Sequence, residues 1–437
     1  MRHFFDTMKT ELLYQIFRES SGISTDTRTL IPGQIFFALW GDNYNGNKFA
    51  SEAIEKGAKI AVIDDASFEN GKTILVDDCL FELQALATHY RKETKALVLA
   101  ITGTNGKTTT KELLTAILSC KFKVHSTKGN LNNQIGVPLT ILSAPEGTEM
   151  MIIEMGASHV GEIRTLCNIA RPDYGIITNT GIAHIEGFGS LEGVIRSKTE
   201  LYEYLRKTNG VALYNDKDPV LKEKIFKMVN RAVPFSDPTG ISLHISPDHS
   251  DINLSLSANY MNQTFRIHTN LFGSYNLENL KAAIAAGLFL GVDMEIIADA
   301  IEKYIPGNNR SEVKVTKNNT LICDSYNANP TSMNIAIESF AKLETENKIC
   351  ILGDMLELGD KSGEEHSRVI ENLKSSGFKN VYLAGLQFTK ASEGSGFKSF
   401  PDAEKLKDFL MKEALTGNHI LIKGSRGMAL EKLYAIL

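Results

Sequence analysis

The chain has 437 residues, and its 47 lysines and arginines against 52 aspartates and glutamates give a formal net charge of −5. At roughly 100–200 residues per domain this length predicts several domains, and the composition (43% hydrophobic, 23% charged) is ordinary for a folded globular protein. The mild acidity gives no electrostatic reason to expect nucleic acid or an anionic membrane as a partner. No apolar run reaches the roughly 18 residues that cross a bilayer, so we expect no membrane span.

Cysteine usage and the start of the chain indicate the compartment. The five cysteines lie far apart without a CxxC pair, which argues against both a disulfide framework and a zinc ribbon. The first 17 residues are amphipathic and carry acidic side chains, which is not typical of a signal peptide. We therefore expect a cytoplasmic protein with reduced thiols.

The order of strand and helix signals predicts an α/β fold in three domains. Residues 1–95 mix short strands with helices, and residues 96–308 alternate strands and helices in the way typical of a parallel sheet covered by helices. A polar section at 236–270 instead predicts short antiparallel strands. After a Pro-Gly-Asn-Asn turn, residues 309–437 resume the alternation and predict a Rossmann-like domain.

The strongest motif is a glycine-rich loop between an apolar strand and a helix. Loop amides and a helix N-terminus bind anions, the glycines admit phosphates closely, the loop lysine reaches the terminal phosphates, and the following threonine ligates Mg²⁺. Because Ile101 stands where the general pattern has its first glycine, the loop is a shortened variant. The alternative is a glycine turn before a surface lysine. The predicted nucleotide-binding residues are Gly103, Thr104, Asn105, Gly106, Lys107, Thr108 and Thr109.

Three further residues are candidates for metal or phosphate chemistry. Glu154 ends an apolar strand, where open α/β sheets place their ligands, although a solvated strand-end acid is an equal alternative. His184 follows another strand end that carries Asn179 at its tip, and a structural histidine is the more frequent outcome. Lys198 lies in a charged helix, so an exposed helix lysine is the default interpretation.

Together these residues resemble the Mur ligase family, the ATP-dependent amide-bond ligases of peptidoglycan precursor synthesis and folate polyglutamylation. The resemblance covers almost the whole chain, and its motifs occur in the family's order. They are the loop at 103–109, Glu154, the segment 179–184, Lys198, Asn276 with Asn279, Arg310 and Asp324.

Four segments are most similar to the family members that add D-alanyl-D-alanine to a UDP-N-acetylmuramoyl-tripeptide: 129–138, 183–194, 325–333 and 352–359. The sister ligases that add the third residue usually carry Tyr-Ala-His near 326–328, and the folate enzymes usually have Gly-Ser after the loop lysine; this chain has neither. The resemblance implies these two substrates, ATP, and an acyl-phosphate intermediate. The alternatives are a Mur-family ligase with another amino acceptor, and a nucleotide-binding regulator of the same fold without ligase activity.

The resemblance also implies catalytic roles. Lys107 and two Mg²⁺ ions would offset the repulsion between a carboxylate and ATP, with Thr108 and Glu154 holding the ion that bridges the β- and γ-phosphates. His184 would help to bind the second ion. Lys198 would carry a carbamate, which turns a cation into an anionic oxygen ligand. The implied catalytic residues are Lys107, His184 and Lys198.

Other matched positions imply contacts with nucleotide and substrates. Asn276 and Asn279 would lie near adenine, although Asn276 could instead be a helix N-cap. Arg310 would reach the phosphates when the C-terminal domain closes, and Asp324 would contact the ribose or, alternatively, cap a turn. The first domain resembles the UDP-sugar module of the family, although its motif at 25–28 could instead simply brace a turn. The implied substrate-binding residues are Thr27 and Arg28 for the UDP end, Asn130, Asn132 and Asn133 for the muramoyl-peptide part, and Asn327 and Asn329 for the dipeptide. We expect a monomer.

Overall fold

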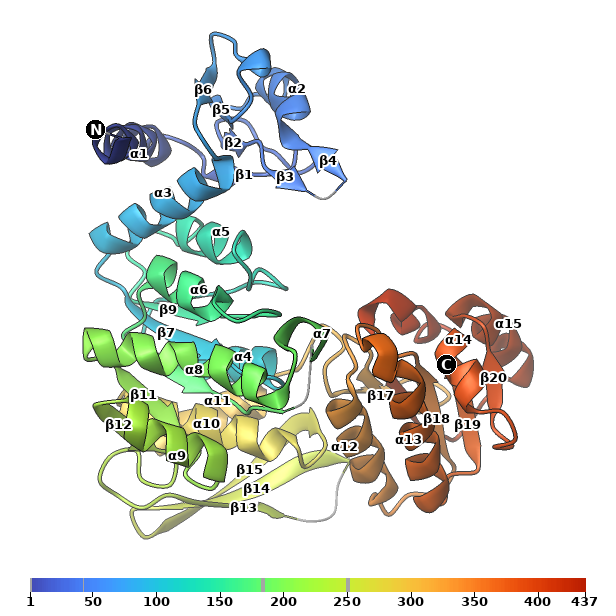
Figure 1. Cartoon of the computed structure of the whole chain (residues 1–437). Helices are drawn as coiled ribbons and strands as arrows, with labels where there is room; N and C mark the ends of the chain where they lie inside the picture. Colours follow the sequence, from blue (N-terminus) through green and yellow to red (C-terminus); the bar gives the residue numbers. More distant parts are fainter. Residues whose placement is uncertain (1, 42, 182–184, 249–251) are drawn as a thin grey trace.

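The computed structural model describes residues 2–41, 43–181, 185–248 and 252–437, which form three lobes (Figure 1). The first lobe holds a parallel four-stranded sheet in the order β1-β2-β5-β6, flanked by a small antiparallel hairpin. Its strands are β1 (Ile23–Ser24), β2 (Ile35–Phe37), β3 (Trp40–Gly41), β4 (Tyr44–Asn45), β5 (Ile60–Ile63) and β6 (Thr73–Leu75). Its helices are α1 (Arg2–Arg18), η1 (Gly46–Phe49), α2 (Ala50–Glu55), η2 (Ala66–Phe68) and α3 (Cys79–Glu93).

The central lobe is built on a parallel six-stranded sheet in the order β12-β11-β10-β7-β9-β8. Its strands are β7 (Leu97–Thr102), β8 (Val124–Ser126), β9 (Met150–Glu154), β10 (Tyr174–Ile177), β11 (Val211–Tyr214) and β12 (Arg231–Pro234). Its helices are α4 (Lys107–Leu118), α5 (Gly136–Leu142), α6 (Glu162–Ala170), α7 (Ile185–Phe188), α8 (Leu191–Thr208), α9 (Pro219–Met228), α10 (Asn276–Phe289) and α11 (Met294–Lys303).

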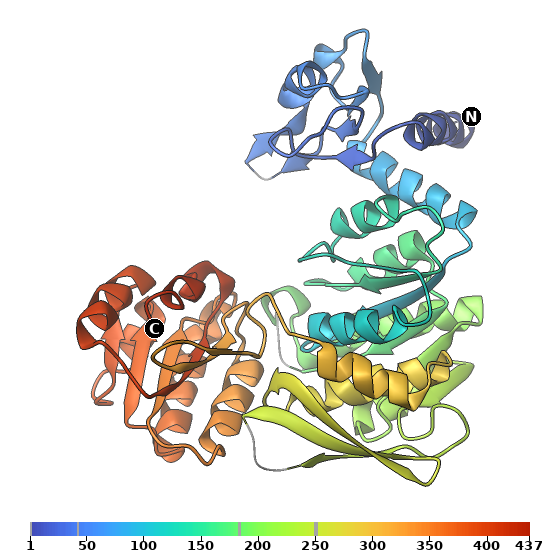
Figure 2. The same cartoon turned by 180° about the vertical axis from the view of Figure 1, so that it is seen from behind.

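Both faces of this sheet are covered, which explains its continuously apolar strands. Successive side chains of a strand point to opposite faces. In β7, Val98 and Ala100 pack into a core shared with α3, α5, α6 and α8, whereas Leu99 and Ile101 pack against α4, α10 and α11 on the other face (Figure 2). The parallel sheet predicted for this region is confirmed.

A nine-stranded sheet in the order β13-β14-β15-β16-β17-β21-β18-β19-β20 runs from the central lobe into the third lobe. Its strands are β13 (His244–Asp248), β14 (Asn253–Tyr260), β15 (Gln263–Phe272), β16 (Glu312–Val315), β17 (Thr320–Asp324), β18 (Lys348–Gly353), β19 (Asn380–Ala384), β20 (Lys398–Phe400) and β21 (His419–Lys423). The first five strands pair antiparallel, as predicted for 236–270, and β17 to β20 pair parallel. The helices of the third lobe are α12 (Pro330–Ala341), η3 (Gly359–Lys361), α13 (Ser362–Ser375), α14 (Leu386–Ala391), α15 (Ala403–Glu413), η4 (Arg426–Met428) and η5 (Leu430–Leu433).

We propose domains at residues 1–95, 96–308 and 309–437. Within the long sheet, a single residue pair, Leu271 with Glu312, joins β15 to β16. The chain reaches that junction through a short linker in which Asn308, Asn309 and Ser311 all have positive φ (59°, 56° and 52°). Few backbone bonds therefore fix the third lobe to the central one. None of the helices in the described part of the chain combines the length and the apolar character that a membrane crossing requires.

Candidate functional site

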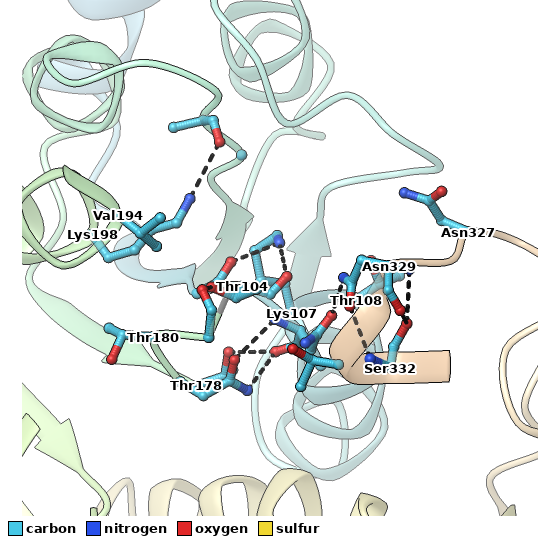
Figure 3. Close-up of a pocket in the computed structure, with 18 of the residues that line it drawn as sticks. Thr104, Lys107, Thr108, Thr178, Thr180, Val194, Lys198, Asn327, Asn329 and Ser332 are labelled. Atoms are coloured by element: carbon cyan, nitrogen blue, oxygen red, sulfur yellow. Dashed lines mark hydrogen bonds between the residues drawn. The ribbon is translucent and has the colours of Figure 1, made fainter. Parts of the chain in front are cut away.

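A cavity of about 1700 Å³ lies between the central and third lobes. On the central side it is lined by segments that follow β7, β9 and β10, three neighbouring strands whose carboxyl ends meet at one edge of the sheet. On the other side it is lined by residues of the linker, of the loop before α12 and of the end of β21. Figure 3 shows Lys198 and Val194 on one side of the phosphate loop and Asn327, Asn329 and Ser332 on the other.

The phosphate loop needs both of its glycines. Gly103 and Gly106 have φ values of 143° and 79°, which other residues rarely adopt. A Cβ atom on Gly103 would collide with the Thr178 hydroxyl, and one on Gly106 would collide with the side chain of Asn279. The loop therefore passes close to β10 and α10 and leads directly into the N-terminus of α4.

The loop is clamped by polar side chains that follow β10. The Asn105 N–H donates to Asn179 Oδ1 and Asn179 Nδ2 donates back to the Asn105 carbonyl, each at 3.0 Å. The Thr178 hydroxyl donates to the same carbonyl at 2.6 Å. These bonds occupy the outward backbone groups of Asn105 and leave the inner face of the loop free for an anion.

Lys107 is held inside the loop. Its Nζ donates to the carbonyls of Gly103 (2.7 Å) and Thr104 (3.0 Å). Burial lowers the pKa of this ammonium, Arg310 acts in the same direction, and the negative charge of Glu154 opposes them. Lys107 is half-buried, and an anion in the loop would compensate its partly desolvated positive charge, so the site favours an anionic ligand.

Glu154 has the environment of a metal ligand. It is 2% exposed, and its Oε1 accepts a hydrogen bond from Asn132 Nδ2 at 2.8 Å. Its Oε2 is buried and has no hydrogen-bond partner, an expensive state that a bound cation would relieve. No group of three or more His, Cys, Asp or Glu side chains able to hold a metal occurs among the described residues. A site with the single carboxylate of Glu154 fits Mg²⁺, which commonly uses one or two carboxylates together with phosphate oxygens and water.

Lys198 is 3% exposed, so its interpretation as an exposed helix lysine is wrong. Its Nζ donates a long hydrogen bond to the Ala157 carbonyl (3.4 Å) and lies 5.3 Å from the ring centre of Phe188. Burial lowers its pKa to about 7, assisted by Lys107 and opposed by Glu162 and Glu200. A substantial fraction of this amine is therefore neutral near pH 7 and available as a nucleophile.

The third lobe reaches the phosphate loop through Asn329. This residue caps α12, and its Nδ2 donates to Asn105 Oδ1 at 2.8 Å (Figure 3). Nearby, the guanidinium of Arg310 lies 3.7 Å from the ring centre of Tyr326, and its buried Nε has no hydrogen-bond partner. The two lobes thus contact one another across the phosphate loop.

Comparison with known families agrees with this geometry. Family models match residues 19–88 ("Mur ligase family, catalytic domain"), 101–287 ("Mur ligase middle domain") and 309–426 ("Mur ligase, glutamate ligase domain"). The UDP-N-acetylmuramoyl-tripeptide–D-alanyl-D-alanine ligase of Bacillus subtilis (strain 168) is 36% identical over 430 residues, which cover 94% of this chain and 92% of that protein. The chain belongs to the Mur ligase family.

Solved structures of Mur ligases have the same fold. A crystal structure of MurF from Acinetobacter baumannii matches with a TM-score of 0.85 and 27% identity, over 96% of this chain and 97% of that one. The MurF ligase of Thermotoga maritima in complex with ADP matches with a TM-score of 0.84 and 26% identity, with the same coverage. The predicted membership of the family and the α/β fold are both confirmed.

Other predicted nucleotide contacts of the Mur family have internal partners in this chain. Asn276 donates to the Phe272 carbonyl (2.8 Å) and accepts from Asn279 Nδ2 (2.9 Å). The N-cap of α10 is Tyr275, so the alternative of Asn276 as an N-cap is wrong. Asp324 accepts from the Ser311 N–H (3.1 Å) and from Lys423 Nζ (2.7 Å), which ties the linker to the third lobe. All these side chains except that of Phe272 line the cavity, and contacts with adenine or ribose stay predictions.

The predicted substrate residues are spread over a wider area. Asn132, Asn133, Asn327 and Asn329 line the cavity, and Asn130 lines a neighbouring cavity of about 140 Å³. Thr27 and Arg28 belong to the first lobe and line neither: Thr27 is buried, whereas Arg28 is exposed and pairs with Asp26 at 2.6 Å. His184 lies outside the described residues. The clamp by Thr178 and the stacking by Tyr326 were not predicted; for Thr178 the only signal was its place at a strand end.

Proposed function

We propose that this chain is an ATP-dependent ligase that joins D-alanyl-D-alanine to UDP-N-acetylmuramoyl-tripeptide and so forms the UDP-muramoyl-pentapeptide precursor of peptidoglycan. The substrates are those named for the Bacillus subtilis relative, and the Thermotoga maritima relative has bound ADP. One observation carries the chemistry: a single cavity collects the phosphate loop, a carboxylate with an unpartnered buried oxygen, and a buried lysine of lowered pKa. These groups suit a reaction between two anions.

The reaction has two steps. In the first, the terminal carboxylate of the tripeptide attacks the γ-phosphorus of ATP, a carboxyl O–P bond forms, and ADP leaves. Because both reactants are negative, the site must supply positive charge more than acid–base chemistry. Lys107, the loop amides and the α4 N-terminus supply it, and Arg310 adds charge from the linker. In the second step the amine of the dipeptide attacks the acyl carbon, phosphate leaves, and the ammonium proton is lost.

Thr108 and Glu154 would hold one Mg²⁺, and His184 with Lys198 would take part in holding a second. Bound Mg²⁺ neutralises charge on the phosphates and the attacking carboxylate. For Lys198 we propose a carbamate: the neutral amine forms an N–C bond to CO₂ and releases a proton. The low pKa of Lys198 supports this proposal, because only the neutral amine reacts.

Substrate contacts complete the proposal. The first lobe, with Thr27 and Arg28, would bind the UDP end, and the segment 130–133 the muramoyl-peptide part. Asn327 and Asn329 would meet the dipeptide. The nucleotide would use Asn276, Asn279 and Asp324 for its adenosine part. We further propose a cytoplasmic monomer.

Phosphate release with one amine at a time tests the activity. Purified protein with ATP, Mg²⁺ and UDP-muramoyl tripeptide should release phosphate when D-alanyl-D-alanine is added and should yield a pentapeptide product by mass spectrometry. Release with diaminopimelate or lysine on a UDP-muramoyl dipeptide would identify the third-residue ligase instead. Binding of ADP without phosphate release for any amine would favour the alternative of a nucleotide-binding regulator without ligase activity.

The contact between Asn329 and Asn105 makes a separate prediction. Asn329→Ser keeps a capping side chain for α12 but is too short to reach Asn105, so kcat/KM for ATP should fall about 2- to 10-fold, the effect of one hydrogen bond. The thermal unfolding midpoint should stay unchanged. The matched control is Asn334→Ser, which removes an amide pair with Asn372 (2.9 Å) from the same helix without touching the cavity. Equal kinetics for both variants would exclude a role for the contact.

A further inference from the structure

Lys111 is a buried cation that the proposed mechanism does not use. It is 1% exposed, and only Lys198 and Lys423 are comparably buried among the lysines that the structure describes. Those two line the cavity, whereas Lys111 does not. Its Nζ donates to the Thr127 carbonyl at 2.5 Å and pairs with Glu112 Oε1 at 2.7 Å. A buried lysine loses much hydration, so a defined structural task is expected of it.

Thr127, the partner of Lys111, holds the backbone of Glu154. It is 1% exposed and follows β8, where its N–H donates to the Ile152 carbonyl at 3.0 Å. Its hydroxyl accepts a hydrogen bond from the Glu154 N–H at 3.0 Å. The Thr127 backbone is therefore fixed on one side by Lys111 and β9, and its side chain fixes the residue that carries the unpartnered carboxylate oxygen.

The same segment also holds the carboxylate of Glu154. A few residues after Thr127 the chain supplies Asn132, whose Nδ2 donates to Glu154 Oε1 at 2.8 Å. The backbone and one oxygen of Glu154 thus depend on a segment that starts at the carbonyl bound by Lys111. The second oxygen, Oε2, is left for a cation.

Lys111 also belongs to the helix that carries the phosphate loop. Lys107 and Lys111 lie four residues apart in α4, one helical turn, and Thr108 lies between them. Lys107 bonds to the loop, and Lys111 bonds to the support of Glu154. One rigid helix therefore relates the position of Thr108 to that of Glu154, the two proposed ligands of one ion.

We propose that Lys111 is a positioning residue for the divalent cation: through Thr127 it fixes Glu154 at the distance from the phosphate loop that joint coordination requires. The inference rests on the proposed metal role of Glu154 and Thr108. Loss of such indirect support typically weakens metal binding about 10- to 100-fold. Nucleotide binding without metal should change little, because the loop and its clamp by Asn179 stay intact.

Binding of Mn²⁺ in the presence of ADP, measured by electron paramagnetic resonance, tests the proposal without using activity. Lys111→Met should weaken Mn²⁺ binding about 10- to 100-fold, while ADP affinity in EDTA, measured by calorimetry, should change less than about twofold. The half-saturating Mg²⁺ concentration for turnover should rise in parallel, with kcat at saturating Mg²⁺ largely retained. The matched control is Lys121→Met, which removes an ammonium from the carbonyls of Leu290 and Gly291 beyond the other end of α4.

A second pair of variants covers the case in which Lys111→Met does not fold. Thr127→Val removes the hydroxyl that accepts from Glu154, and Thr127→Ser keeps it. We expect weakened Mn²⁺ binding in Thr127→Val and wild-type Mn²⁺ binding in Thr127→Ser. If Thr127→Val, or a folded Lys111→Met, binds Mn²⁺ as tightly as the wild type does, the positioning role of Lys111 is wrong. This conclusion holds even if the protein is an active ligase. Absence of Mn²⁺ binding in the wild type with ADP would instead overturn the proposed metal site itself.

Discussion

Lys198→Ala is expected to lower kcat for pentapeptide formation by about 10³-fold, because it removes the proposed carbamate, an anionic oxygen ligand, from a site that must hold two polyanions together. Short-chain carboxylic acids such as acetate should restore part of the turnover, since the cavity left by the side chain can admit a carboxylate at the same place. The measurement is steady-state phosphate release at rising acetate concentration.

A matched variant tests the specificity of this rescue. Lys198→Met fills the volume of the buried side chain but neither carries a carbamate nor leaves room for an acid, so it should be inactive at every acetate concentration. Circular dichroism should show that both variants are folded. Full activity of Lys198→Ala, or equal response of both variants to acetate, would contradict the role.

The lowered pKa of Lys198 gives this prediction a pH dependence. Carbamylation needs the neutral amine, and with a pKa of about 7 the neutral fraction rises from roughly a tenth at pH 6 to roughly nine-tenths at pH 8. Protein stripped of CO₂ should therefore regain activity faster at pH 8 than at pH 6 when dissolved CO₂ is held constant. A carbon-13 carbamate signal after addition of labelled CO₂ should grow in parallel.

The sequence predicted the features that depend on local pattern. The phosphate loop is predicted by a strand, two glycines and a helix start, which are all features of neighbouring residues. The strand-end position of Glu154 indicated the sheet edge that holds ligands, with a solvated acid as an equal alternative; the structure buries Glu154 in the wall of the cavity. Both inferences need only the direction of the strands, and the alternation of strand and helix signals in the sequence indicates that the strands are parallel.

Features that depend on packing between distant segments were not predictable from the residues. Lys198 looked like an exposed lysine, and its burial arises because α8 packs against α6 and presents that residue to the cavity. The bond between Asn105 and Asn329 joins residues 224 positions apart in the chain, and no local pattern encodes it.

Glu154→Gln is expected to slow ligation strongly and to stabilise the protein without metal. Glutamine keeps the volume and the oxygen that accepts from Asn132, but it replaces the buried, unpartnered Oε2 by a neutral group. A buried carboxylate oxygen that receives no hydrogen bond is more costly than a buried amide, even with the charge of Lys107 nearby, so unfolding of the metal-free variant should become harder by about 1–2 kcal/mol. Turnover with Mg²⁺ should fall about 10³-fold, because the proposed anionic ligand of the cation is lost.

The opposite signs of these two effects distinguish a metal ligand from a structural carboxylate. Wild-type protein should gain about 2.7 kcal/mol of stability from ADP with Mg²⁺ at a hundredfold excess over Kd, and the variant should lose the part of this gain that depends on Mg²⁺. The control Glu149→Gln alters a carboxylate just before β9 that accepts from the Lys123 N–H at 2.7 Å, and it should leave turnover unchanged. Thermal unfolding monitored with and without EDTA provides the comparison. A metal-free Glu154→Gln protein that is less stable than the wild type would show that Glu154 supports the fold itself, and a retained Mg²⁺-dependent gain would place the cation elsewhere.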